Sequence, residues 1–243
     1  MLYLIGLGVW NEKDVSLRGI DICKRADSIY CELYTSHWGG DLDKLSKIIG
    51  KKIRKLERKH VEEGSDKLLE ESKSRSVVLL VPGDPLIATT HVHLILEAKK
   101  KGISVEIVHS SSIYTTVART GLQIYKFGKT GTIITPKKGY DSRGFYDIIS
   151  ENLSKGMHTL LLLDRDMGTR RGLEILNRIE SKKRKKLLRG KKIVLCSRLS
   201  SEHERIVYGS FENLMGKDLP EPGVIIVPGK LHFLEKEFLE TLR

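Results

Sequence analysis

The first 110 residues alternate between short apolar runs and stretches in which apolar residues recur every three or four positions. Runs of the first kind predict β-strands, and the second spacing predicts amphipathic helices. The predicted strands cover residues 2–9, 28–34, 52–56, 77–81 and 105–108, and the predicted helices begin near residues 14, 41, 61 and 90. Strands that alternate with helices are typical of an α/β domain with a mostly parallel sheet.

The second half of the chain shows the same patterns in a less regular order. Strands are predicted at residues 131–135, 158–163, 192–197, 206–208 and 223–227, and helices at 113–120, 142–154, 170–188 and 234–242. The mixed order of connections predicts an α/β domain with a mixed sheet that includes antiparallel strands. The small polar run from His109 to Ser112 interrupts the pattern, so the predicted domains are residues 1–110 and 111–243.

Composition places the chain among soluble globular proteins. Of its 243 residues, 40% are hydrophobic and 30% are charged. No apolar run approaches the ~18–20 residues that span a bilayer, and the start has neither the basic segment nor the cleavage site of a secretory signal. We therefore expect a cytoplasmic protein without a membrane partner. Three separate cysteines, Cys23, Cys31 and Cys196, are predicted to be reduced core residues.

The net charge of +12 favours acidic partners in general. The densest basic cluster, residues 182–186, comes at the end of a predicted helix, where cations complement the helix dipole. A solvated helix end is the favoured interpretation, and a nucleic-acid patch is the alternative. The cluster contains no aromatic residue, and aromatic residues make up only 6% of the chain, so no stacking platform for RNA is indicated.

The loop after the apolar run 77–81 is the main candidate for chemistry. Pro82 and Pro85 stiffen both sides of Gly83 and place Asp84 on a preset loop at the carboxyl end of a predicted strand. Ligands of open α/β sheets bind at that edge. The alternative is an ordinary connection in which Asp84 caps the next helix.

Most familiar catalytic signatures are absent. The chain has no His-Glu-x-x-His motif, cysteine pair, Walker lysine motif or Gly-x-Ser-x-Gly elbow. His91 and His93 do not face the same way on a helix, so we predict no metal site. The turn Gly6-Leu7-Gly8 lacks the third glycine of a dinucleotide fingerprint. What remains is a set of glycine-rich and small polar loops at strand ends, which suits an adenosyl ligand held by backbone groups and apolar walls.

Six segments at these loops resemble the diphthine synthases, methyltransferases of diphthamide biosynthesis within the tetrapyrrole methylase superfamily. They are residues 6–14 (GLGVWNEKD), 34–36 (YTS), 82–91 (PGDPLIATTH), 112–114 (SIY), 120–130 (TGLQIYKFGKT) and 227–232 (VPGKLH). The resemblance runs in order along nearly the whole chain. It implies two α/β domains with S-adenosyl-L-methionine bound in a cleft between them, and it implies a homodimer.

The resemblance also implies residues and a reaction. The cofactor contacts carried over from the family are Val9, Asp84, Ile87, Ser112, Ile113, Leu163, Ser197 and His232. The implied reaction methylates the amino group of a 3-carboxy-3-aminopropyl histidine on translation elongation factor 2. The amine must lose a proton before each attack, and no residue is assigned as its base. The alternatives are a related methylase acting on ribosomal RNA or a tetrapyrrole, and a basic RNA-binding protein without catalysis.

Overall fold

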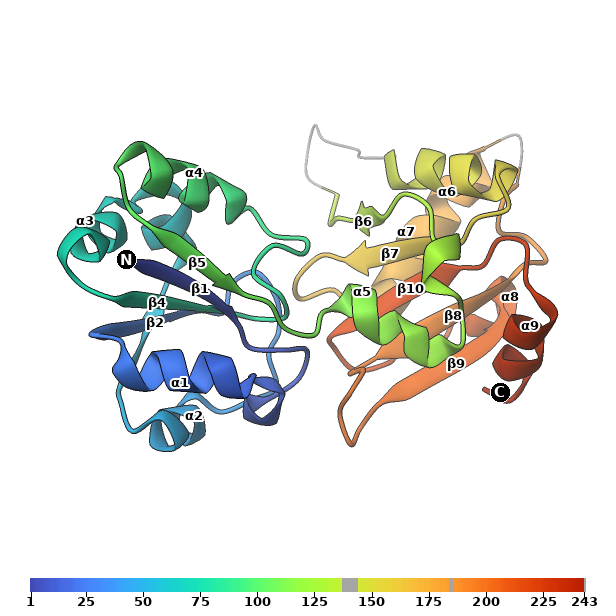
Figure 1. Ribbon diagram of the computed structural model, residues 1–243. Coiled ribbons are helices and arrows are strands. Elements are labelled where there is room, and N and C mark those ends of the chain that lie inside the picture. Colours follow the sequence, from blue (N-terminus) through green and yellow to red (C-terminus); the bar gives the residue numbers. More distant parts are fainter. Residues whose placement is uncertain (137–143, 184–185, 243) are drawn as a thin grey trace. The chain divides into compact units, whose positions relative to one another are not determined.

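A computed structural model describes residues 1–136, 144–183 and 186–242 (Figure 1). Contacts within the chain divide it into two compact units, Met1–Thr116 and Val117–Arg243. The sequence had placed the division at residues 110 and 111, six positions earlier. Within the described residues, no helix has the length and apolar character needed to cross a membrane.

The first unit is a five-stranded parallel sheet covered by helices. Its strands are β1 (Leu2–Gly6), β2 (Ser28–Glu32), β3 (Ile53–Leu56), β4 (Val77–Val81) and β5 (Val105–Val108), and its main helices are α1 (Leu17–Arg25), α2 (Leu42–Ile49), α3 (Asp66–Ser74) and α4 (Val92–Lys100). The strand order is β3-β2-β4-β1-β5, and every pair is parallel. The predicted parallel sheet is therefore confirmed.

Strand β4 shows why this sheet needs helices on both faces. All five of its residues are buried. Val78 and Leu80 pack with residues of α1 and α2, whereas Val77, Leu79 and Val81 pack with residues of α3 and α4. The continuous apolar run is thus the sequence signature of a strand buried on both faces.

The helix ends carry the expected local signals. Ser16 caps α1 by accepting from the Gly19 amide at 3.1 Å, and Asp41 caps α2 by accepting from the Asp43 amide at 2.7 Å. Gly50, with φ of 77°, ends α2 in the left-handed conformation that glycine tolerates.

The strand order of this sheet contains a topological switch point between β1 and β4. The helices that follow β1 and β4 cover opposite faces, although the two strands are neighbours. In open α/β sheets this arrangement separates the loops that follow the two strands, and ligands bind beside those loops at the carboxyl edge.

The second unit contains a mixed five-stranded sheet. Its strands are β6 (Gly131–Ile133), β7 (Thr159–Leu163), β8 (Lys192–Ser197), β9 (Arg205–Ser210) and β10 (Gly223–Val227), and its main helices are α6 (Gly144–Ser154), α7 (Thr169–Lys182) and α9 (Phe233–Glu240), with the short α8 (Phe211–Leu214). The order is β6-β7-β10-β8-β9. Among the described strands of this sheet, β6 and β7 pair in parallel and the other neighbours pair antiparallel, so the predicted antiparallel strands are confirmed.

Two predicted helices differ from the structure. The helix predicted from residue 61 to 74 is divided into a π-helical turn, η2 (Lys59–Glu63), and α3, with Gly64 and Ser65 between them. The helix predicted over 170–188 ends at Lys182. It ends there because the buried carboxylate of Glu180 accepts hydrogen bonds from the amides of residues 187–189, which turns the chain back.

Shorter differences occur at two other elements. The first strand ends at Gly6 rather than continuing to residue 9, because Gly8 adopts a φ of 77°. The helix predicted over 113–120 consists of α5 (Ile113–Thr116) and the 3-10 turn η3 (Val117–Thr120). Residues 142 and 143 of a predicted helix, and Arg184 and Lys185 of the basic cluster, lie outside the described residues.

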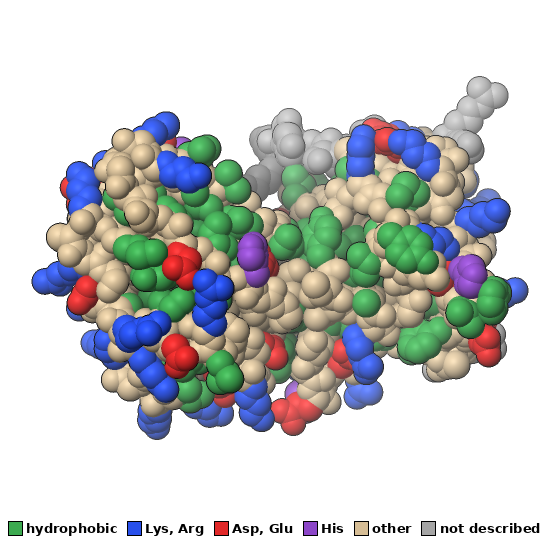
Figure 2. All heavy atoms as spheres, viewed as in Figure 1, with side chains coloured by type: hydrophobic (Ala, Val, Ile, Leu, Met, Phe, Trp, Pro, Cys, Tyr) green, Lys and Arg blue, Asp and Glu red, His purple; other side chains and the backbone are tan. Residues whose placement is uncertain are grey.

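Basic side chains are spread over the face of each unit seen in Figure 2 rather than gathered in one patch. Lysine and arginine together number 43 against 31 acidic residues. On this visible face the positive charge does not form the single stripe that marks many nucleic-acid-binding proteins.

Candidate functional site

Three loops meet at the carboxyl edge of the first sheet. Gly8 and Gly83 form an isolated antiparallel bridge in which each amide donates to the other residue's carbonyl, at 3.1 and 2.9 Å. The Val9 amide donates to Ser111 Oγ at 3.3 Å. The loops that follow β1, β4 and β5 are therefore held together by hydrogen bonds and form one surface.

Asp84 joins two of these loops. Its side chain is 4% exposed. Oδ1 accepts from the Leu86 amide at 3.0 Å, and Oδ2 accepts from the Ser110 amide at 3.1 Å and from His109 Nδ1 at 2.8 Å. Because a carboxylate only accepts, Nδ1 carries the proton in this bond. Asp84 does not cap the next helix, which corrects the alternative interpretation of this residue: α4 begins at Val92, with His91 at its N-cap.

Apolar side chains lie beside this hydrogen-bonded surface. Val9 and Ile113 are partly exposed, and Ile87 is 36% exposed. Gly83 has a φ of 67°, and a methyl group added to its Cα would meet no atom within 4 Å. Backbone groups, partly exposed apolar side chains and open space over a glycine fit an adenosyl ligand, whose flat base needs apolar walls.

Ser112 is placed differently from its neighbours. It is buried, and its carbonyl accepts from the amides and hydroxyls of Thr115 and Thr116. Ser112 therefore starts α5 rather than serving as an activated nucleophile. This arrangement agrees with a positioning role for residues 110–112.

A buried acidic residue lies next to this surface, at the end of β2. Glu32 is fully buried and accepts from the amides of Tyr34 and Thr35, at 3.0 and 3.1 Å, and from the Thr35 hydroxyl. Burial raises the pKa of the Glu32 carboxyl, although these hydrogen bonds oppose the shift.

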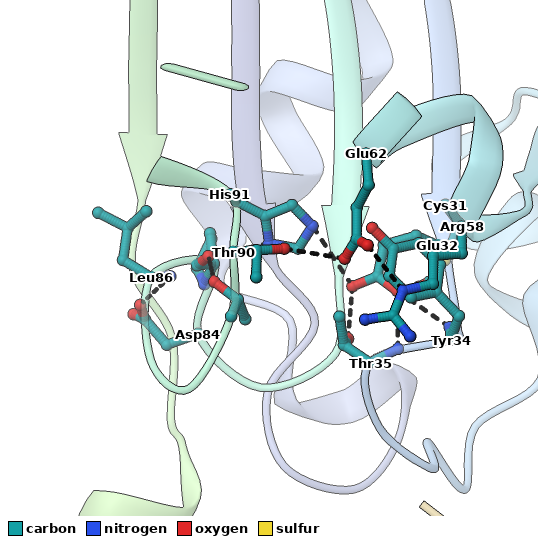
Figure 3. A network of polar contacts seen from close by, with 12 residues as sticks. Cys31, Glu32, Tyr34, Thr35, Arg58, Glu62, Asp84, Leu86, Thr90 and His91 are labelled. Carbon is teal, nitrogen blue, oxygen red and sulfur yellow. Dashed lines mark hydrogen bonds and ion pairs between the residues drawn. The ribbon is translucent and has the colours of Figure 1, made fainter. Parts of the chain in front are cut away.

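His91 connects Glu32 to the Asp84 loop (Figure 3). The His91 side chain is 1% exposed, with Nδ1 3.1 Å from the Pro85 carbonyl oxygen and Nε2 3.8 Å from Glu32 Oε1. Glu62, on η2, accepts from the Thr90 hydroxyl at 2.9 Å and from Arg58 Nε at 2.7 Å. The loop that carries Asp84 is therefore flanked by a second, acidic group of side chains.

The sheet of the second unit brings two of the predicted cofactor residues together. Leu163 ends β7 and Ser197 ends β8, on either side of the first residue of β10, Gly223. The side chains of both are engaged within the unit: Leu163 packs against α7 and the Ser197 hydroxyl donates to the Pro220 carbonyl. Contact with a ligand at this edge would fall to their backbone groups.

His232 lies at the opposite edge of the same sheet. It follows the carboxyl end of β10, and β10 runs antiparallel to β7 and β8. His232 therefore does not share an edge with Leu163 and Ser197. Its ring caps α9 by accepting from the Leu234 amide at 3.3 Å, which gives it a structural role.

A buried carboxylate fixes the loop that carries His232. Glu235 accepts from the amides of Gln123 and His232, from His158 Nε2 at 3.0 Å and from Lys126. Burial would raise the pKa of Glu235, but these four donors lower it to about 2. His158 Nδ1 accepts from the Gly229 amide at 2.9 Å, so His158 is neutral with its proton on Nε2, and burial lowers its pKa.

Comparison with known proteins agrees with this architecture. Residues 1–215 match the family described as Tetrapyrrole (Corrin/Porphyrin) Methylases. The chain belongs to the tetrapyrrole methylases. Among relatives, the diphthine synthase of Methanocaldococcus jannaschii is 43% identical and that of Methanococcus aeolicus 42% identical, each covering 100% of this chain and 98% of the relative. A crystal structure of diphthine synthase matches with a TM-score of 0.91 at 37% identity, covering 99% of this chain and 95% of that one.

This tetrapyrrole methylase is a methyltransferase, and the likeness extends along the whole chain to the diphthine synthases. Sequence reasoning had named Asp84 and its loop but missed three residues that the structure places beside it, Glu32, His91 and His109. His91 had been considered only as half of a metal pair with His93. One signal was available, because Thr35 and His91 both fall inside segments that carry the resemblance.

Proposed function

We propose that this tetrapyrrole methylase transfers methyl groups from S-adenosyl-L-methionine to the amino group of a 3-carboxy-3-aminopropyl histidine on translation elongation factor 2. The observation that carries the proposal is the surface formed by the three loops, together with full-length similarity to diphthine synthases. The finer parts, the cofactor, the amino group and the protein substrate, come from the family resemblance.

The cofactor is assigned first to the loops of the first unit. Val9, Ile87 and Ile113 supply partly exposed apolar groups, and Asp84 and Ser112 hold the loops that carry them. When bound, S-adenosyl-L-methionine supplies an electrophilic methyl group on a sulfonium. The protein contributes alignment of the acceptor and exclusion of water.

In the second unit we assign Leu163 and Ser197 to the cofactor as one pair, because they share an edge of the sheet. His232 is left out of that pair because it lies at the other edge. The family resemblance further implies a homodimer, which light scattering on the purified protein would test.

Mass spectrometry provides the deciding experiment. Elongation factor 2 that carries the 3-carboxy-3-aminopropyl group is incubated with this protein and S-adenosyl-L-methionine. We expect successive additions of one methyl mass on the modified histidine peptide, and none on elongation factor 2 that lacks the group. Methylation of ribosomal RNA or of a tetrapyrrole under the same conditions, with elongation factor 2 unchanged, would replace the proposal with the related-methylase alternative.

A further inference from the structure

Four side chains next to the Asp84 loop form a polar group, here called the His91 cluster, in which Glu32 and His91 are buried and Tyr34 and Glu62 are partly exposed. Two buried atoms of this cluster, His91 Nε2 and the Tyr34 hydroxyl, have no hydrogen-bond partner among the described residues. Leaving a buried polar atom without a partner costs about 1–3 kcal/mol, so this pair of atoms marks the cluster as a candidate site for a further polar group.

The environment of His91 determines what its free nitrogen can do. Nδ1 lies 3.1 Å from the Pro85 carbonyl oxygen, which can only accept, so Nδ1 carries a proton. In the neutral ring Nε2 therefore has a free lone pair. Glu32 Oε1 is 3.8 Å away, too far for a hydrogen bond but close enough to stabilise a positive imidazolium.

The charges of the cluster favour a positive ligand. Glu62 is paired with Arg58 at 2.7 Å, whereas Glu32 has no cationic side chain paired with it among the described residues. The raised pKa of Glu32 follows from this burial without a counter-charge. Both carboxylates also raise the pKa of Tyr34, after burial itself. A group with several N–H donors and one positive charge would satisfy Nε2, the hydroxyl oxygen and Glu32 together, and an ammonium group has these properties.

The cluster is also close to the surface on one side. Glu62 forms that side, with its side chain 26% exposed, and among the described residues its hydrogen-bond donors are Arg58 and the exposed Thr90 hydroxyl. Glu62 belongs to the π-helical turn η2, and such turns are frequent at functional sites. Figure 3 shows His91 between the Asp84 loop and the side chains of Glu32 and Glu62.

From these observations we propose that the His91 cluster binds the amino group of the methyl acceptor and that His91 Nε2 takes its proton. The inference rests on the proposed function. The ammonium group gives one proton to Nε2, which leaves a neutral amine and an imidazolium beside Glu32. The amine lone pair then forms the N–CH₃ bond while the S–CH₃ bond breaks and its electron pair stays on sulfur. The imidazolium returns its proton to water before the next methyl transfer.

One test of the subsite does not depend on methyl transfer. The probe is L-2-aminobutanoate, which carries an ammonium and a carboxylate, and 2-hydroxybutanoate is the matched control without the amine. In protein labelled with ¹⁵N-histidine, the Nε2 resonance of His91 is identified by its loss in His91→Asn. We expect it to move on titration with L-2-aminobutanoate and to remain unmoved with the hydroxy acid. Equal shifts with both probes, or none with either, would overturn the ammonium subsite.

Kinetics test the role of the proton acceptor. In His91→Asn the amide nitrogen takes the place of Nδ1 beside the Pro85 carbonyl, so the loop contact is kept and Nε2 is removed. We expect kcat at pH 7 to fall by about 10²–10⁴, with a rate that recovers as pH rises and frees the amine. The cofactor Kd measured by calorimetry should stay within about twofold because the loop is kept. The groups that face His91 are Glu32 on β2, Glu62 and Arg58 at η2, and Tyr34. The profile is therefore repeated in Glu32→Gln, in which we expect kcat at pH 7 to fall because the imidazolium loses the carboxylate beside it.

Tyr30→Phe is the matched control. Tyr30 lies on β2, the strand that ends at Glu32, but its hydroxyl donates to Glu71 at 2.7 Å, away from His91. This variant should leave kcat and its pH profile unchanged, whereas Tyr34→Phe should raise KM for the protein substrate. A His91→Asn enzyme with the wild-type pH profile would refute the proton transfer. If L-2-aminobutanoate moves the His91 resonance while elongation factor 2 is never methylated, the subsite stands and the proposed substrate fails.

Discussion

Replacing Asp84 by alanine tests whether the three-loop surface is the cofactor site. The substitution removes three hydrogen bonds, from the Leu86 and Ser110 amides and from His109. Hydrogen bonds to a charged acceptor contribute about 1.5–3 kcal/mol each, and the exposed His109 is easily rehydrated, so we expect the free energy of unfolding to fall by about 2–5 kcal/mol. The loop after β4 would also separate from the loop after β5. Because both loops are assigned to the cofactor, its Kd should rise about tenfold to hundredfold, which equals about 1.4–2.8 kcal/mol.

Asp27→Ala provides the matched control. Asp27 also accepts two hydrogen bonds that join separate loops, from the Ser76 amide at 2.8 Å and the Ser76 hydroxyl at 2.9 Å, but it is exposed and lies at the amino edge of the same sheet. It should lower the melting temperature slightly and leave the cofactor Kd unchanged. Thermal melts and titration calorimetry with S-adenosyl-L-methionine are run on both variants. A lowered melting temperature of Asp84→Ala with an unaltered Kd would make Asp84 a fold residue only and would refute the assignment.

Four further outcomes are expected. Gly83→Ala and Gly102→Ala should each cost about 1–2 kcal/mol of stability, because both glycines have a positive φ (67° and 69°) and equally open space around them. Gly83→Ala should also weaken cofactor binding, whereas Gly102→Ala should not, and equal cofactor affinities of the two variants would place the ligand elsewhere. The pKa values of His158 and Glu235 are lowered in the folded protein, so the stability that these groups contribute is present above their unfolded pKa values and is lost as pH falls. The loss begins at about 6.5 for His158 and runs from about 4.5 down to about 2 for Glu235. In urea titrations, the free energy of unfolding of Glu235→Gln should depend less on pH in this acid range. A strong chelator should not change the cofactor Kd, and recovery of lost binding by a divalent ion would contradict the metal-free prediction. The double variant Lys182→Gln, Lys183→Gln should slow methylation of elongation factor 2 at low salt only, since electrostatic steering of the protein substrate is screened over ~10 Å at 0.1 M ionic strength. Unchanged methylation rates at low salt would leave these residues as a solvated helix end.

The strands of this fold were readable from the sequence because their signals are local. The apolar run of residues 77–81 predicted a strand, which is confirmed, and β4 is buried on both faces as such an uninterrupted run requires. The residue at which α7 ends could not be predicted from the sequence. It depends on the buried Glu180 side chain, which accepts from amides seven to nine residues further along the chain and bonds to Tyr146. Periodicity alone carries no information about such a contact.

The sequence predicted which loops form the candidate site but not the contacts between them. The proline-flanked loop placed Asp84 at a strand end, yet its partners His109 and Ser110 lie 25 and 26 residues away, and these contacts depend on β4 and β5 both flanking β1. The position of His232 likewise could not be predicted from local sequence. The family resemblance named it among the cofactor contacts together with Leu163 and Ser197, but it could not tell that the direction of β10 puts His232 at the other edge of the sheet from those two residues. Strand direction in a mixed sheet is a property of the whole unit.

The carboxylate of Glu235 has a consequence for the order in which the second unit folds during synthesis. Its donors come from residues as far as 112 positions earlier in the chain. Until Glu235 has left the ribosome, the buried His158 and the partly exposed Lys126 lack their acceptor, and the loop after β10 lacks its anchor. The first unit, with its own core and its own sheet, has all its strands by residue 108. Domains made first generally fold first, so a nascent chain halted before residue 235 should carry a protease-resistant first unit followed by a protease-sensitive remainder.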